Sequence, residues 1–399
     1  MSLRARRRTR AVASLAVWLM IVGCSTTATS TATSTGAARA FPTPLQLIVD
    51  HRPAPTGDTI EVFVCDVPMP TTDPLYGDLP LRLALSPQRI VEQLQGVRAY
   101  FMSISHGLYA PTFTAGSTLT MAADETHDHC VDRALDASTA GAATALVVAS
   151  AEDLATRPGG WGKPGSPCPT AFCPASVTRR SAYVGASDFY GAESGGQPLL
   201  DLIEHEIGHT LDLPHSGDVD DEHASALDLM SNSAAPRDVQ PARIDAPDTI
   251  AIDRVGLGWL PDAAIAVAES APKSTIGTFG LRPSTGNVGL RLLVLPVDET
   301  KFVTVEFLPT TGYDDYLPAA GLAVHLVDQS PEACGRPAPG ALCLGIDRTQ
   351  IVLGSPAPHL RLLHLAGSVL TVEGWTIRLA NDIASTTDQA QVEVTPTDG

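Results

Sequence analysis

The sequence predicts an α/β domain followed by a β-sandwich-like domain, and three observations support this prediction. The chain has 399 residues, 44% of them hydrophobic and 18% charged, so it can form more than one domain and bury sizeable cores. Its 33 glycines and 32 prolines are too many for a helix bundle and suit a protein rich in loops and strands. Helix-like and strand-like segments alternate up to about residue 262, and short strand-like segments follow.

The N-terminal segment has the pattern of an export signal. Residues 1–10 contain five arginines, and the 13 apolar residues from Ala11 to Gly23 are too few to cross a bilayer comfortably. They end in the sequence IVGC, which resembles a bacterial lipobox. The resemblance implies that residues 1–23 are a lipoprotein signal peptide and that Cys24 carries a lipid that anchors the exported protein at the cell surface. A plain secretory peptide, with Cys24 incidental, is the alternative.

The remaining chain divides into three parts. Residues 24–44 are rich in Ser, Thr and Ala and have no core-forming pattern, so we expect a flexible tether. We place the α/β domain at 45–262 and the β-rich domain at 263–399.

The cysteine content agrees with export. Six of the seven cysteines lie beyond Cys24, and an even number in an exported chain favours disulfides. Closeness in sequence, and then elimination, favours three pairs: Cys168–Cys173, Cys334–Cys343 and Cys65–Cys130. Free or metal-binding thiols are the alternative, although the sequence contains no CxxC pair.

The elements of the α/β domain follow from apolar spacing. Apolar runs predict strands at 45–50, 59–67, 144–150 and 181–187. Apolar residues at helical spacing predict a helix over 86–107, which starts at a Ser-Pro pair and stops at Gly107. A loop rich in Gly and Pro is expected at 156–180.

The β-rich domain consists of short strand-like segments separated by turn residues, as in a β-sandwich. These segments are 289–297, 301–309, 321–328, 368–380 and 389–396.

The segment 198–215 (PLLDLIEHEIGHTLDLPH) indicates metal chemistry. We expect a helix that begins near Pro198 and ends before Pro214. His205 and His209 are four residues apart, so they lie on one helical face and can bind the same zinc ion. Glu206 then lies beside the metal and can act as a general base on a water molecule.

His215 completes the predicted site if the chain turns back after the helix. Three His ligands and one open position make a catalytic zinc site, whereas a structural site has four protein ligands. A surface helix with incidental histidines is one alternative. A second is a site whose third ligand is a later glutamate, for which Glu222 is the nearest candidate.

The residues 205–216 (HEIGHTLDLPHS) resemble HExxHxxGxxH, the extended zinc signature of the metzincin peptidases. The segment 226–231 (ALDLMS) resembles their Met-turn, which implies that Met230 lies beneath the zinc as a packing residue. Further similarity points to the gametolysin-like and immune-inhibitor-A-like peptidases; it lies at residues 100–107, 254–260, 302–307 and 312–314. The resemblance covers about residues 95–330 and implies a metzincin-like catalytic fold, a twisted sheet with an active-site helix.

Asp212 departs from the signature, which has glycine at this position. Glycine suits a chain that leaves a helix with positive φ. Asp is one of the few other residues that tolerate this conformation, so we keep His215 as third ligand.

Other polar residues give weaker indications. A calcium site is possible in principle at Asp218, Asp220, Asp221 and Glu222, but the EF-hand spacing is absent and a solvated acidic loop is the simpler interpretation. Asp201 or Asp228 can orient a ligand histidine, or can simply be exposed or capping carboxylates. By family analogy, the strand at 181–187 can form an edge that pairs with an extended substrate.

The sequence therefore predicts an exported, lipid-anchored zinc endopeptidase that acts on proteins or peptides. A catalytically degenerate surface lipoprotein that serves as a binding module is the alternative, and hydrolysis of a non-protein amide is a third reading. Its net charge of −18 argues against nucleic-acid binding. The sequence sets no expectation for the oligomeric state.

Overall fold

The computed structural model of the chain describes residues 41–50, 52, 57–67, 83–151, 159–164, 179–193, 196–216, 223–268, 276–330, 347–350, 362–383 and 388–397. All of them belong to one compact unit, Phe41–Gly399. Several predicted features lie outside these ranges: the signal peptide, Cys24, most of the tether, Cys168, Cys173, Cys334, Cys343 and the acidic run 218–222. Within the described ranges, no helix is long and apolar enough to span a membrane.

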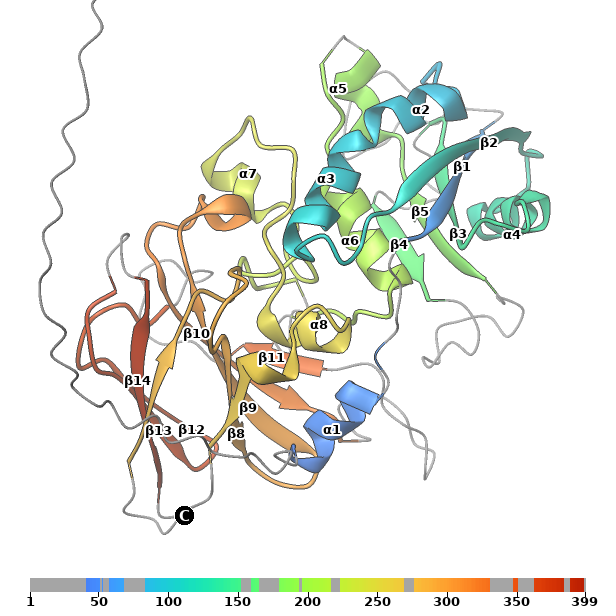
Figure 1. Cartoon of the computed structure of the whole chain (residues 1–399). Helices are drawn as coiled ribbons and strands as arrows, with labels where there is room; N and C mark the ends of the chain where they lie inside the picture. Colours follow the sequence, from blue (N-terminus) through green and yellow to red (C-terminus); the bar gives the residue numbers. More distant parts are fainter. Residues whose placement is uncertain are drawn as a thin grey trace, which may run out of the picture. The chain divides into compact units, whose positions relative to one another are not determined.

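A five-stranded sheet organises the N-terminal half, with strand order β2-β1-β3-β5-β4 (Figure 1). Four strands are parallel and β4 runs antiparallel to β5. The sheet consists of β1 (Thr59–Asp66), β2 (Thr112–Thr120), β3 (Thr144–Ala149), β4 (Gly160–Lys163) and β5 (Arg180–Val184).

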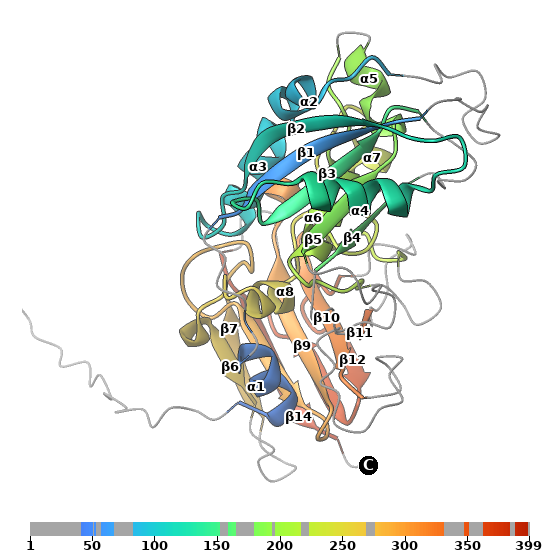
Figure 2. The same ribbon diagram turned by 90° about the vertical axis from the view of Figure 1, so that its right-hand side faces the viewer.

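Helices cover both faces of this sheet (Figure 2). On one face, Val62 of β1 and Leu146 of β3 share a core with α2 (Pro87–Gln93), α3 (Gln95–Ile104) and α6 (Asp201–Thr210). On the other face, Phe63 and Val147 share a core with α4 (His127–Ala137). Burial on both faces explains why β1 and β3 are continuous apolar runs instead of alternating patterns.

Two further sheets form the C-terminal half, with strand orders β11-β10-β9-β8-β6 and β12-β13-β14-β7. Val305 of the first sheet and Ile377 of the second belong to one core, so the sheets pack face to face, as the sequence predicted. The strands are β6 (Ile265–Val267), β7 (Gly277–Leu281), β8 (Leu292–Pro296), β9 (Lys301–Leu308), β10 (Gly321–Asp328), β11 (Asp347–Gln350), β12 (Val369–Val372), β13 (Trp375–Leu379) and β14 (Ala390–Pro396).

The remaining elements are short. They are α1 (Thr43–Asp50), α5 (Tyr190–Glu193), α7 (Ala235–Val239), α8 (Ala251–Gly256) and the 3-10 turns η1 (Ser187–Phe189), η2 (Asp262–Ala264) and η3 (Gly312–Asp314).

The strand predicted at 45–50 is wrong, because these residues form α1. Leu45 and Ile48, one helical turn apart, are both buried and share a core with Ile252 and Val255 of α8. A short apolar run fits the strand period and the helix period equally well, and here packing against α8 decides.

Two other predicted elements need correction. The helix predicted over 86–107 is divided at Leu94 into α2 and α3, although Ser86 caps α2 by accepting a hydrogen bond from the Arg89 amide. The loop predicted at 156–180 contains β4, which was not expected.

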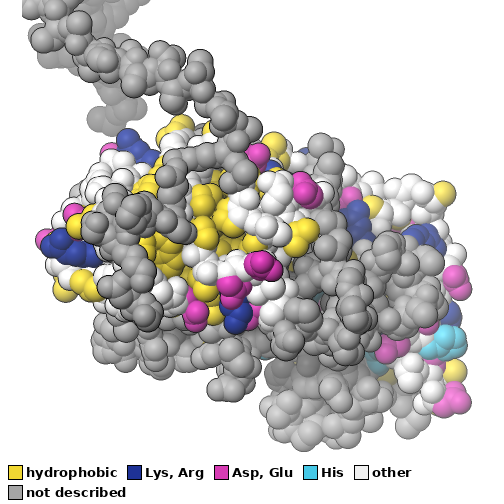
Figure 3. Space-filling view, turned by 90° about the horizontal axis from the view of Figure 1, so that it is seen from below, with side chains coloured by type: hydrophobic (Ala, Val, Ile, Leu, Met, Phe, Trp, Pro, Cys, Tyr) yellow, Lys and Arg dark blue, Asp and Glu magenta, His cyan; other side chains and the backbone are white. Residues whose placement is uncertain are grey.

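The described surface carries apolar as well as charged side chains. Figure 3 shows apolar side chains gathered over one area, with charged side chains of both signs around it. Among the described residues of the C-terminal half, the most exposed large apolar side chain is that of Val288, at 65%. Exposed apolar residues are common on protein surfaces, and we assign this one no role.

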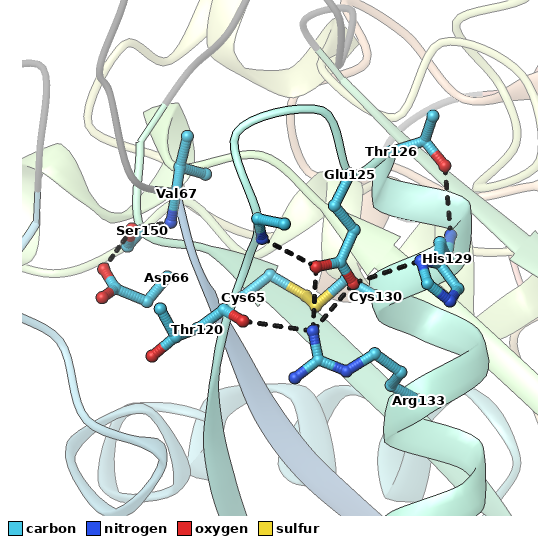
Figure 4. Close-up of a disulfide and its surroundings, with 11 residues drawn as sticks. Cys65, Asp66, Val67, Thr120, Glu125, Thr126, His129, Cys130, Arg133 and Ser150 are labelled. Atoms are coloured by element: carbon cyan, nitrogen blue, oxygen red, sulfur yellow. Dashed lines mark hydrogen bonds and ion pairs between the residues drawn. A yellow bond between two sulfur atoms is a disulfide. The ribbon is translucent and has the colours of Figure 1, made fainter.

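Cys65 and Cys130 form a disulfide that ties the end of β1 to α4 (Figure 4). Both cysteines are fully buried. Beside the disulfide, Arg133 donates hydrogen bonds to both carboxylate oxygens of Glu125, at 2.8 and 2.9 Å. This pairing agrees with the sequence prediction and with a chain that folds in an oxidising compartment.

A buried charged network joins the two halves of the unit. Arg254 of α8 is fully buried and forms an ion pair with Asp248. The amide of Ala251, at the start of α8, donates to the Glu306 carboxylate of β9 at 3.0–3.1 Å. The Asp248 amide donates to Asp314, which follows β9, at 3.2 Å. Burial raises the pKa of Glu306 to about 7. The sandwich therefore contacts the segment that leads into α8 through specific hydrogen bonds.

Candidate metal centre

The start of α6 is fixed by buried polar contacts. The helix begins at Asp201, three residues later than predicted, and the amides of Leu200 and Asp201 both donate to the carbonyl of Ile244. The Asp201 carboxylate forms an ion pair with Arg237 at 2.8 Å and is 1% exposed. Its side chain therefore anchors α7 to α6, and within the described part of the chain it has no hydrogen bond to His205, His209 or His215.

The end of α6 turns as the sequence predicted. Asp212 has a φ of 70°, and the Leu213 amide donates back to the carbonyl of Gly208 at 3.2 Å. This is the closing bond of a helix that ends in a left-handed residue. The turn brings His215 back alongside α6, where its Nε2 lies 3.0 Å from Nε2 of His209.

Three imidazoles converge on one point. Nε2 of His209 also lies 3.1 Å from Nε2 of His205. Nδ1 of His205 and Nδ1 of His209 each lie 2.7 Å from a backbone carbonyl, that of Leu229 and Leu213 respectively. A carbonyl only accepts, so both Nδ1 atoms carry the proton and both Nε2 atoms present bare lone pairs.

Two bare lone pairs at this distance repel each other unless a cation lies between them. Nitrogens about 2.0–2.1 Å from one zinc ion in tetrahedral geometry are about 3.3–3.4 Å apart, close to the observed separations. Burial, together with the neighbouring His215, lowers the pKa of His205 to about 3, so the ring stays neutral and able to bind metal. The donor set fits a zinc ion.

Glu206 lies next to these rings in the interior. It is 3% exposed, and its Oε2 atom has no hydrogen-bond partner within the described part of the chain. Ligand atoms of Glu206, His205 and His209 all lie within 4.8 Å of one another. Burial and the nearby charge of Asp188 raise the pKa of Glu206 well above its usual value. An unpartnered buried carboxylate oxygen beside imidazoles suits a group that exchanges a proton with a small ligand.

Strand β4 covers the other side of Glu206. A Cβ atom at Gly160 would lie 2.9 Å from Oε1 of Glu206, and one at Gly162 would lie 2.1 Å from the Glu206 carbonyl oxygen. The two glycines thus let the strand lie directly against α6. The strand at 181–187 was expected to be an edge, but β5 lies between β3 and β4, and β4 takes the end position.

Met230 lies beneath the middle of α6. It is fully buried, and a Cβ atom at Gly208 would lie 2.4 Å from its Sδ atom. The preceding carbonyl, that of Leu229, is the partner of His205 Nδ1. The segment at Leu229 and Met230 therefore contacts α6 through the packing of Met230 and contacts His205 through one backbone hydrogen bond.

Asp228 holds this turn in place through hydrogen bonds to three neighbouring residues. Its Oδ1 atom accepts from the Thr249 hydroxyl and the Ile250 amide, both at 3.1 Å. Its Oδ2 atom accepts from the hydroxyl of Ser216, the residue after His215. The carboxylate links the turn at Leu229 and Met230 to the segment that carries His215 and to the start of α8.

The sequence interpretation missed His223. This residue is exposed, and its ring centroid lies 4.6 Å from that of His215 and 6.0 Å from that of His205. Sequence reasoning treated the neighbouring residues as an acidic loop. The only available signal was a fourth histidine eight residues after His215, outside the family signature.

Comparisons with known protein families and with curated proteins found no relative of this chain. No protein-family model matches the chain, and no curated protein matches it.

Substitutions at Asp212 test the turn that positions His215. Asp212→Gly is expected to keep zinc and activity, with stability unchanged or raised by up to about 1 kcal/mol, because glycine adopts positive φ without a Cβ penalty. Asp212→Val is expected to weaken zinc binding, because a β-branched residue strongly disfavours this conformation. Melting temperature and zinc affinity of both variants are the measurements. A strongly destabilised Gly variant with a silent Val variant would contradict the role of this turn.

Proposed function

We propose that this protein is an exported, lipid-anchored zinc endopeptidase of the metzincin type. The observation that carries the proposal is the convergence of three imidazole Nε2 atoms beside the unpartnered carboxylate oxygen of Glu206. His205, His209 and His215 are the proposed ligands. The Met-turn packing of Met230 against Gly208 supports the family assignment, which otherwise rests on the resemblance of residues 205–216 and 226–231.

A bound zinc ion would polarise the peptide carbonyl and make water more acidic. Glu206 accepts the proton of the attacking water and then donates it to the departing amine. A raised pKa suits the second role, since a carboxylate with an ordinary pKa is a poor proton donor at neutral pH. The carbonyls of Leu229 and Leu213 fix the tautomers of the first two histidines, which keeps their Nε2 atoms available.

The proposed location rests on two features. The lipobox-like residues 21–24 supply the anchor, and the Cys65–Cys130 disulfide fits folding outside the cytoplasm. The proposed substrates are proteins or peptides that reach the cell surface.

Metal analysis combined with a cleavage assay tests the proposed function. Purified protein that begins after Cys24 is expected to hold about one zinc ion per chain and to cleave casein. A chelator is expected to remove both the zinc and the activity, and added zinc to restore both. A chain that neither holds nor rebinds zinc at neutral pH would contradict the metal site. A zinc-loaded chain without cleavage would favour the binding-module alternative.

A further inference from the structure

His223 is a fourth imidazole beside the proposed zinc ligands. Its ring lies across that of His215, with an interplanar angle of 60° and a centroid distance of 4.6 Å. One ligand atom from each of His205, His215 and His223 lies within 4.8 Å of the other two. The cluster therefore contains one more nitrogen ligand than the family signature supplies.

Glu206 and His223 share one neighbour in the cluster and differ in the other. Glu206 groups with His205 and His209, whereas His223 groups with His205 and His215. The fourth imidazole and the proposed base therefore share His205 as a neighbour, and each has a second neighbouring histidine that the other lacks.

We propose that His223 is a fourth ligand of the resting centre and that it keeps the enzyme latent. This inference rests on the proposed function, because it requires zinc at the three histidines. Four protein ligands close a zinc site, whereas three leave the position that catalysis needs. While His223 is bound, that position is filled, so hydrolysis requires His223 to leave.

Exposure distinguishes His223 from the other ligands. His205 is 4% exposed and its Nδ1 atom is tied to the Leu229 carbonyl, so its ring cannot leave without disturbing the core. His223 lies at the surface, so its ring can move away without exposing apolar residues. It is therefore the ligand that incoming substrate can displace.

X-ray absorption at the zinc edge tests the inference on the zinc-loaded mature chain. The parent protein is expected to show four imidazole ligands, and both His223→Ala and His223→Gln are expected to show three. Zinc affinity, measured by competition with a chelator, is expected to fall by about tenfold or more in both variants. The initial rate of casein cleavage is expected to rise at least severalfold when zinc is kept in excess.

His129→Ala is the matched control. His129 is also an exposed histidine, with 66% of its side chain accessible, but it lies on α4 and pairs with Glu125. Its replacement is expected to leave ligand number, affinity and rate unchanged.

The outcomes separate this inference from the proposed function. Three imidazoles in parent and variants alike, or equal zinc affinity, overturns the role of His223 even if the enzyme cleaves casein. Four imidazoles with a variant that is no faster overturns latency. If the parent shows four imidazole ligands but neither the parent nor any variant cleaves casein, His223 remains a ligand and the proposed peptidase activity is contradicted. A parent that binds no zinc overturns both.

Discussion

Glu206→Gln is expected to abolish hydrolysis while the chain keeps its zinc. The substitution preserves the size of the side chain and its packing against β4, but an amide cannot accept the proton of the attacking water. Loss of a general base at this position is expected to lower kcat by at least about 10²–10⁴-fold. Zinc content is expected to stay at the parent level, because none of the proposed ligands changes.

Glu204→Gln is the matched control for this experiment. Glu204 is also fully buried on α6, but its carboxylate accepts a hydrogen bond from the Ala246 amide at 2.9 Å and lies outside the imidazole cluster. The control is expected to keep both zinc and most of its activity. Turnover of Glu206→Gln above a few per cent of the parent value would remove Glu206 from the mechanism.

Gly162→Ala is expected to damage the centre through the backbone. The added methyl group would lie 2.1 Å from the Glu206 carbonyl oxygen and 2.6 Å from the Cβ atom of His209. Neither atom belongs to a flexible side-chain end, so β4 and α6 must separate, which displaces the base and one ligand together. We expect a loss of about 3 kcal/mol in stability, at the upper end for overpacking, and a matching fall in zinc affinity.

Gly141→Ala separates this effect from the general cost of replacing a glycine. An added Cβ atom at Gly141 would have no atom within 4 Å. The melting temperature and zinc affinity of the Gly141→Ala variant are therefore expected to equal those of the parent. Thermal unfolding followed by circular dichroism and chelator competition measure both quantities. If Gly162→Ala matches Gly141→Ala, β4 does not constrain the centre.

Much of the fold was predictable because its signals are local. The apolar runs of β1 and β3 are rich in β-branched residues, which favour a strand buried on both faces. The positive φ of Asp212 was likewise predictable, because a chain that must return His215 to the helix needs a left-handed residue near this point.

The elements that sequence reasoning missed depend on distant partners. Residues 160–163 (GWGK) are poor in β-branched residues and become a strand only because β5 pairs with them. The packing of α1 depends on α8, about two hundred residues away. The proximity of His223 to His215 depends on the three-dimensional path of the chain after α6, which no spacing rule supplies.

The hydrogen bond from the Ala251 amide to Glu306 limits whether the C-terminal half can be removed or replaced. Ala251 follows Ile250, whose amide is bonded to Asp228, and Asp228 precedes the carbonyl that fixes His205. A protease cut near residue 262 that released the sandwich would leave the Ala251 and Asp248 amides without their acceptors and would uncover the apolar face shared with Phe302. Shedding the C-terminal half is therefore expected to destabilise the proposed metal centre instead of activating it, and a foreign tail fused in its place is not expected to restore these contacts.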